Sequence, residues 1–322
     1  MAQHIHGPLY YERMGRTGPV VAFVHPNPMD QSCWIFQLAH LSTWFRCISI
    51  DIPGYGRSPK ADPALTMEDM AEACWEAIDD ALPGETAILV GCSTGSAISP
   101  YMYHHRPDKT AALVLSGTGY TPEKAFAKHR IDSYRSNGID YRWRYTFEDF
   151  SPAFQATPLD HYFANLFSER NEFADVETII HQFRALQRPD PEGHHANIAC
   201  PTVILTGSED KAHPSAFALQ ERIPECELKV LPGAGHACQI EQPWLFNRFM
   251  IEFLTKHKLF RSAKIEDMTA KEDIEIIEGQ QSRLGVNFSI LDVTKDGKQE
   301  SKIKLKVAQK IKEKKIELQM QF

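Results

Sequence analysis

Short apolar runs alternate with stretches of helical periodicity from residue 8 to about residue 258. Apart from the last of them, ELKVLPG, these runs carry no charged residue in their interior, as expected where both faces of a sheet are covered. The predicted strands are VVAFVH (20–25), CISID (47–51), TAILVG (86–91), AALVLSG (111–117), PTVILTG (201–207) and ELKVLPG (227–233). Strands that alternate with helices predict parallel βαβ units and a doubly wound sheet.

Three segments between or after these runs have the spacing of amphipathic helices. The first is TMEDMAEACWEAIDDAL (66–82), in which Thr66 is the predicted N-cap and acidic residues follow in the first turn. The others are SAISPYMYHHRP (96–107) and QPWLFNRFMIEFLTKH (242–257). They supply the crossovers and the final layer that a parallel sheet requires.

About 80 residues between the strands at 111–117 and 201–207 contain no clear strand. A structureless loop of that length is unusual, so we predict a helical insertion. Its aromatic residues could line a ligand pocket or form the insertion's own core, and we favour the core. They include Tyr134, Tyr141, Trp143, Tyr145, Phe147, Phe150, Phe154, Tyr162, Phe163 and Phe167.

Two of these aromatics, Trp143 and Phe147, are our candidates for contact with a substrate. Arg142 and Arg144 flank Trp143. These arginines could hold a substrate carboxylate, or they could be surface charges, which is the interpretation we favour.

Residues 259–322 differ in composition from the rest of the chain. Positions 264–281 carry six acidic residues against two lysines, whereas positions 295–315 carry nine lysines against three acidic residues. The alternating segments KIKLKV (302–307) and IELQMQF (316–322) favour a small β appendage. A charged edge strand or partial disorder are the alternatives, and no chemistry is evident here.

Composition excludes several classes of protein. The net charge of −7 argues against general nucleic-acid binding. No apolar run approaches the ~18 residues of a membrane span, and the N-terminal MAQHIHGPLYYERMG lacks a signal-peptide layout. We therefore expect a cytoplasmic protein that binds neither nucleic acid nor membrane, and leave homo-oligomerisation open.

Cysteine and histidine usage gives no indication of a metal site. The seven cysteines include no CxxC pair. The adjacent pairs His104–His105 and His194–His195 would point apart on a helix, which makes them poor joint ligands.

The clearest chemical motif is GCSTG (91–95), which lies between a predicted strand and a predicted helix. In this context G-x-S-x-G predicts a nucleophile elbow that presents Ser93 at the edge of the sheet, with flanking glycines that let strand and helix come close. The helix N-terminus would supply N–H donors for a developing oxyanion.

A serine nucleophile needs a base, and the base needs an orienting acid. His236 lies in the glycine-rich LPGAGHACQIEQP after the last predicted strand, and Asp210 lies in ILTGSEDKAHP after the strand before it. The chain order Ser93, Asp210, His236 is the order that the elbow motif predicts. Glu209 is the rival acid.

With these motifs, residues 8–258 resemble the α/β-hydrolase superfamily, and DIPGYGRS (51–58) is similar to a loop common in it. The resemblance implies a mostly parallel eight-stranded sheet with helices on both faces. It implies a hydrolase core at 1–118 and 197–258 with a helical cap at 119–196. The overall layout is most similar to 3-oxoadipate enol-lactonases and related esterases or carbon–carbon bond hydrolases.

The resemblance also implies an oxyanion hole. His25-Pro26-Asn27-Pro28 stands where the family has a His-Gly-x-Pro turn, so the donors would be the N–H groups of Asn27 and Thr94. Pro26 in place of glycine removes one N–H and can reshape the turn. A similar His-x-Asn-Pro turn occurs in haloalkane dehalogenases, but these use an aspartate nucleophile. We add His25 to Trp143 and Phe147 as a candidate substrate-binding residue.

The sequence thus predicts a serine hydrolase of a small ester or lactone that needs no cofactor or metal. Carbon–carbon bond hydrolysis and acyl transfer would use the same triad. The alternative from another class is a non-catalytic scaffold that retains the hydrolase fold.

Overall fold

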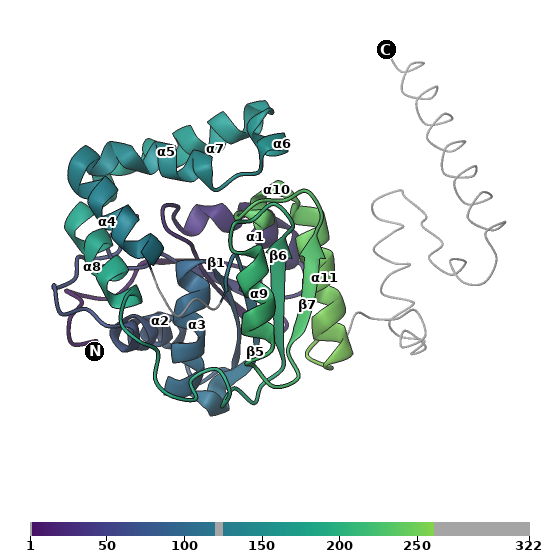
Figure 1. Cartoon of the computed structure of the whole chain (residues 1–322). Coiled ribbons are helices and arrows are strands. Elements are labelled where there is room, and N and C mark those ends of the chain that lie inside the picture. The colour runs from purple at the N-terminus through teal and green to yellow at the C-terminus, as the bar shows by residue number, and fades with distance from the viewer. Residues whose placement is uncertain (1, 120–124, 261–322) are drawn as a thin grey trace, which may run out of the picture. The chain divides into compact units, whose positions relative to one another are not determined.

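A seven-stranded sheet forms the centre of the computed structural model, which describes residues 2–119 and 125–260 (Figure 1). The strand order is β1-β3-β2-β4-β5-β6-β7, and only β1 runs antiparallel to its neighbour. The strands are β1 (Tyr11–Met14), β2 (Val20–Val24), β3 (Arg46–Ile50), β4 (Ala87–Cys92), β5 (Thr110–Ser116), β6 (Thr202–Gly207) and β7 (Glu227–Leu231). The expected count of eight is wrong for the described residues, because the segment before β2 supplies a single edge strand.

The sheet is buried on both faces, which explains why its central strands read as continuous apolar runs. In β2, Val20, Ala22 and Val24 belong to one core cluster, whereas Val21 and Phe23 belong to the other. The first cluster includes residues of α2 (Met67–Ala81), α3 (Thr94–His105) and α9 (His213–Gln220); the second includes residues of α1 (Ile35–Leu41), α10 (Cys238–Glu241) and α11 (Pro243–Lys256).

The three helices predicted by periodicity are all present. Thr66 and Asp69 form a reciprocal capping box at the start of α2, which satisfies N–H groups that the first helical turn leaves free. The helix α3 begins two residues earlier than its apolar pattern suggested, directly after Ser93. Because the elbow turn lets the chain enter a helix without a loop, periodicity alone misplaces that boundary.

Between β5 and β6 the described residues form helices joined by turns, and none of them forms a strand. This segment contains α4 (Ala125–Asn137), α5 (Tyr141–Glu148), α6 (Pro152–Gln155), α7 (Pro158–Ser168) and α8 (Val176–Leu186), with short 3-10 turns. In Figure 1, α5, α6 and α7 lie above the end of the sheet where α10 follows β7. We call residues 119–196 the insertion; its standing as a separate cap domain stays a prediction.

The aromatic residues of the insertion mainly form its core. Tyr134, Tyr141 and Tyr145 are buried and contact one another at ring-centroid distances of 5.1–6.5 Å. Phe183 of α8 adds a further ring contact with Tyr134 at 6.3 Å. These rings join α4, α5 and α8, so their burial stabilises the insertion itself.

Arg142 corrects the expectation that both arginines beside Trp143 are surface charges. Its side chain is fully buried, donates to the Pro28 carbonyl at 2.5 Å and pairs with Asp30 at 3.2 Å. Asp30 also pairs with Arg170 at 2.8 Å, so a buried guanidinium is matched by a buried carboxylate. Arg144 is exposed and pairs with Glu148 on its own helix, as expected of a surface charge.

At the C-terminal end of the described chain, Phe260 is buried against Phe45 at a ring-centroid distance of 4.8 Å. The predicted β appendage lies outside the described residues from position 261 onward. None of the helices described here has the length and apolar character needed to cross a membrane.

Candidate active site

Ser93 occupies a sharp turn between β4 and α3. Its backbone has φ 52° and ψ −110°, a left-handed conformation that is costly for any residue with a Cβ. The N–H of Ser93 donates to the Ser116 carbonyl at 2.8 Å, which fixes the turn against β5. The side chain is consequently held at the carboxyl edge of the sheet, at the N-terminus of α3.

The two glycines of the motif are required by close backbone approach. A Cβ on Gly91 would lie 2.4 Å from the backbone of Gly95, and a Cβ on Gly95 would lie 2.1 Å from the Val24 carbonyl oxygen. No side chain fits at either distance, so the spacing of the motif follows from packing of β4, α3 and β2 around the serine.

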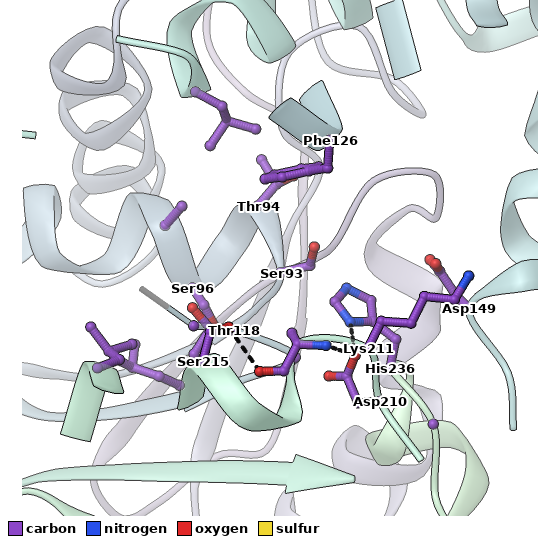
Figure 2. Close-up of a pocket in the computed structure, with 18 of the residues that line it drawn as sticks. Ser93, Thr94, Ser96, Thr118, Phe126, Asp149, Asp210, Lys211, Ser215 and His236 are labelled. Carbon is purple, nitrogen blue, oxygen red and sulfur yellow. Dashed lines mark hydrogen bonds and ion pairs between the residues drawn. The ribbon is translucent and has the colours of Figure 1, made fainter. Parts of the chain in front are cut away.

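His236 and Asp210 form the second part of the site (Figure 2). The Asp210 Oδ1 atom lies 2.9 Å from His236 Nδ1 and accepts the Ala212 N–H at 2.8 Å. The Asp210 side chain is 1% exposed and that of His236 is 21% exposed. Glu209, the rival acid, is exposed to solvent. The structure therefore brings Asp210, rather than Glu209, to the imidazole.

The ionisation of this pair follows from its charges. Burial disfavours the imidazolium, but the charge and hydrogen bond of Asp210, with the charge of Asp149, outweigh burial and raise the pKa of His236 to about 9. Burial likewise opposes ionisation of Asp210, yet the neighbouring His236 keeps the pKa of that carboxyl below its usual value. The imidazole is thus a strong base held in one orientation.

Ser93 and His236 line one cavity of about 720 Å³, together with Asp210. Figure 2 shows the Ser93 side chain beside the His236 ring. Among the described residues, the hydrogen bonds of the site include His236–Asp210 but none from the Ser93 hydroxyl to the imidazole. Such bonds often form only when substrate is bound.

The turn predicted to complete an oxyanion hole lies next to the elbow. Thr94 lines the cavity. Asn27 is fully buried, and its side-chain amide donates to the Thr94 hydroxyl at 3.1 Å. The turn is closed by a hydrogen bond from the Met29 N–H to the Pro26 carbonyl at 3.0 Å. The structure thus joins the two predicted donor residues, although Asn27 is not among the residues that line the cavity.

His25 does not lie in the cavity, contrary to its assignment as a substrate-binding residue. It is fully buried, its Nδ1 donates to the Pro26 carbonyl at 2.9 Å, and its Nε2 accepts the Ile52 N–H at 3.0 Å. Burial lowers the pKa of His25 to about 4, so the ring is neutral. With both nitrogens engaged, it supports the turn and has no atom left for a ligand.

The two aromatic candidates are separated by the structure. Phe147 lines the cavity, whereas Trp143 does not. Trp143 stacks on Phe147 at 5.5 Å, and its indole N–H donates to Asn165 of α7 at 2.8 Å. The tryptophan therefore packs behind Phe147, which is the one of the two that lines the cavity.

Asp149 is the site residue that sequence reasoning missed. It is 7% exposed, lines the cavity and follows the last residue of α5. Burial raises the pKa of its carboxyl to about 7, although the charges of His236 and Arg130 oppose this rise. The only local signal is that Ser151-Pro152 starts a helix, which places Asp149 in a turn between helices.

Comparison with known proteins agrees with this architecture. The Alpha/beta hydrolase family model matches residues 21–246. The chain is 29% identical over 263 residues to the AB hydrolase superfamily protein YisY of Bacillus subtilis, covering 77% of this chain and 96% of YisY. It is 26% identical over 258 residues to the dihydrolipoyllysine-residue acetyltransferase component of the acetoin cleaving system of Pseudomonas putida, covering 77% of this chain and 66% of that protein.

Solved structures show the same fold. A thermophilic esterase from Thermogutta terrifontis superposes with a TM-score of 0.68 at 25% identity, covering 77% of this chain and 93% of the esterase. The enol-lactonase of Burkholderia xenovorans LB400 gives a TM-score of 0.68 at 20% identity, covering 78% and 98%. The resemblance seen in the sequence is confirmed: the chain belongs to the alpha/beta hydrolase family.

Proposed function

We propose that this protein is a serine hydrolase that cleaves a small carboxylic ester or lactone through an acyl-enzyme. The observation that carries the proposal is the meeting of Ser93 with the bonded pair His236–Asp210 in one cavity. A cavity of about 720 Å³ is within the range of small-molecule sites. The esterase and enol-lactonase with similar folds are consistent with this substrate class.

In the proposed acylation step, the Ser93 oxygen attacks the substrate carbonyl carbon as its proton moves to Nε2 of His236. Asp210, bonded to Nδ1, keeps Nε2 free to accept that proton and stabilises the imidazolium. Thr94, which lines the cavity, donates its N–H to the oxyanion, and the adjoining Asn27 is the predicted second donor. The tetrahedral intermediate collapses as His236 returns the proton to the leaving alkoxide.

In the proposed deacylation step, the same groups act on water. His236 takes a proton from water as the oxygen attacks the acyl carbon, and Ser93 regains its proton when the ester bond to the enzyme breaks. Because His236 must be neutral to accept a proton and its pKa is raised to about 9, kcat/KM should increase with pH up to that region.

The test is turnover of a panel of p-nitrophenyl esters and lactones by wild type and two matched serine variants. Ser93→Ala should lower kcat/KM by at least about 10³-fold, because it removes the nucleophile. Ser99→Ala is the control: Ser99 lies on the same helix, and its hydroxyl donates to the Gly95 carbonyl at 2.8 Å. Comparable activity of Ser93→Ala and wild type would refute the proposal.

Acyl transfer is the second candidate, and the matched acetyltransferase component of Pseudomonas putida favours it. The same acyl-enzyme would then be consumed by a thiol or alcohol in place of water. Product analysis with and without an added thiol acceptor distinguishes the two: a thioester product would indicate transfer, and a free acid alone would indicate hydrolysis.

A further inference from the structure

The loop that carries His236 is fastened to the insertion by the main chain of Asp149. The Asp149 carbonyl accepts the His236 N–H at 2.9 Å and the Ala237 N–H at 3.4 Å. These are backbone bonds between segments almost 90 residues apart in sequence. The position of the imidazole therefore depends on the end of α5, as well as on β7 and Asp210.

A second set of contacts closes the same junction. The carboxylate of Glu241, on α10, accepts the Gly235 N–H at 2.9 Å and the Ser151 N–H at 3.2 Å. A Cβ on Gly235 would lie 2.6 Å from the Ser151 nitrogen, so the two loops are in direct contact. We call Asp149, Ser151, Gly235, His236 and Glu241 the clasp.

Asp149 and His236 line the same cavity. The Oδ2 atom of Asp149 is buried and makes no hydrogen bond within the part of the chain that the structure describes. A buried carboxylate without a hydrogen-bond partner is costly, which makes a purely structural reason for an acid here weak. Asparagine or alanine at position 149 would preserve the backbone hydrogen bonds of the clasp without burying a charge.

The charged groups around Asp149 come from every neighbouring element. Arg130 of α4 and Glu148 of α5 lie on the insertion side, and Asp210 and His236 lie on the sheet side. Glu241 binds the backbone of the same junction, and Lys211 lines the same cavity. Arg130 is already engaged, because it pairs with Glu148 at 3.0 Å and lies 3.6 Å from the Tyr145 ring centroid. His236 is therefore the neighbouring group whose charge changes during the proposed reaction, and the negative charge of Asp149 can stabilise its protonated form.

We propose that Asp149 is a second acidic positioning residue for His236, holding the loop through its carbonyl and stabilising the imidazolium through its carboxylate. The proton still moves from Ser93 to Nε2 of His236 and on to the leaving group, and Asp149 neither gains nor loses it. In its catalytic consequence this inference rests on the proposed function, whereas the charge coupling between the two residues can be measured without any substrate.

The experiment compares Asp149→Asn with Glu148→Gln in the full chain. Both remove one acid with little change in shape, but Glu148 is already paired with Arg130 and Arg144. The pKa of His236 is read by NMR of histidine labelled at Cε1, with the resonance assigned from its loss in His236→Gln. Circular dichroism verifies that each variant is folded.

We expect Asp149→Asn to lower the pKa of His236 by about one unit, because a nearby negative charge is removed. Glu148→Gln should lower it by no more than about 0.3 unit, since that acid is already neutralised by arginine. In Asp149→Asn the acid limb of kcat/KM should move to lower pH by the same amount as the NMR titration, and kcat should fall about five- to tenfold.

An unchanged His236 titration in folded Asp149→Asn would overturn the inference, whatever happens to activity. A loss of kcat with an unmoved titration would likewise assign Asp149 a structural role only. Failure of the proposed function is separate, since it would appear as absence of Ser93-dependent turnover in wild type, where the NMR titration can still be recorded.

Discussion

The two walls of the cavity hold their side chains in different ways. On the sheet side, Ser93, Asp210 and His236 each follow the carboxyl end of a strand, β4, β6 and β7. On the insertion side, Asp149 and Phe147 are brought in by α5, whose position depends on contacts with distant segments. The first wall is fixed by backbone packing at the strand ends, with the His236 loop also held by the Asp149 carbonyl. The second is fixed by long-range packing and buried charge.

This difference predicts how strongly activity and stability depend on a substitution in each wall. A change at the elbow acts directly on Ser93, because the glycines leave no space for adjustment. A change in the insertion acts through helix placement, so its effect should be smaller and graded. The predictions below test that ordering.

The largest effect is expected for Gly91→Ala. The added methyl would lie 2.4 Å from the Gly95 backbone, so β4 and α3 must separate. We expect the unfolding free energy to fall by about 3 kcal/mol or more and Ser93 reactivity to fall over about 100-fold. Urea denaturation measures the unfolding free energy, and the rate of fluorophosphonate labelling measures the reactivity of Ser93.

The control for this change is Gly138→Ala in the insertion. Gly138 has φ 62° but no atom within 4 Å of an added Cβ, so only its backbone conformation opposes alanine. We expect Gly138→Ala to lower the unfolding free energy by about 1 kcal/mol and to leave the rate of Ser93 labelling unchanged. Equal losses at the two glycines would contradict the distinction between the walls.

An intermediate effect is expected for Arg142→Met, compared with Arg144→Met. Arg142 is fully buried and joins α5 to Pro28 and Asp30, and its loss leaves Asp30 with Arg170 as its ion-pair partner. The predicted fall in unfolding free energy at pH 7 is about 2–3 kcal/mol. Arg144 is exposed and pairs with Glu148 on its own helix, so Arg144→Met should lower the unfolding free energy by no more than about 0.5 kcal/mol. Urea midpoints that do not differ would exclude a tethering role for Arg142.

The smallest effect is expected for Phe147→Ala, with Trp143→Ala as its partner. Phe147 lines the cavity, so its truncation should raise KM for esters of large acyl groups about fivefold, close to 1 kcal/mol. Trp143 packs behind it and should change KM less than twofold. Steady-state kinetics on acyl chains of increasing length decides the order, and a larger effect at Trp143 would reverse our assignment.

The sequence predicted the sheet side well, for physical reasons. Buried parallel strands appear as apolar runs, and the elbow appears as two glycines around a serine because close packing admits no Cβ. The pairing of His236 with Asp210 could be predicted because chain order and the ends of consecutive strands restrict where the proposed base and acid can lie.

The insertion side was predicted only in outline. That it is helical followed from its length and the lack of strands, but the burial of Arg142 and the approach of Asp149 to His236 depend on pairing across more than 80 residues. The spacing of apolar and polar residues within one helix does not indicate which distant residues will contact it. His25 was misassigned for the same reason, since its partner Ile52 lies in another loop.

The most direct test of the account is intact-mass analysis after treatment with a fluorophosphonate, on wild type and Ser93→Ala. We expect one adduct on wild type, mapped to Ser93, and none on the variant, because only a serine activated by His236 and Asp210 reacts at an appreciable rate. Absence of an adduct on folded wild type, or an equal adduct on Ser93→Ala, would contradict this expectation.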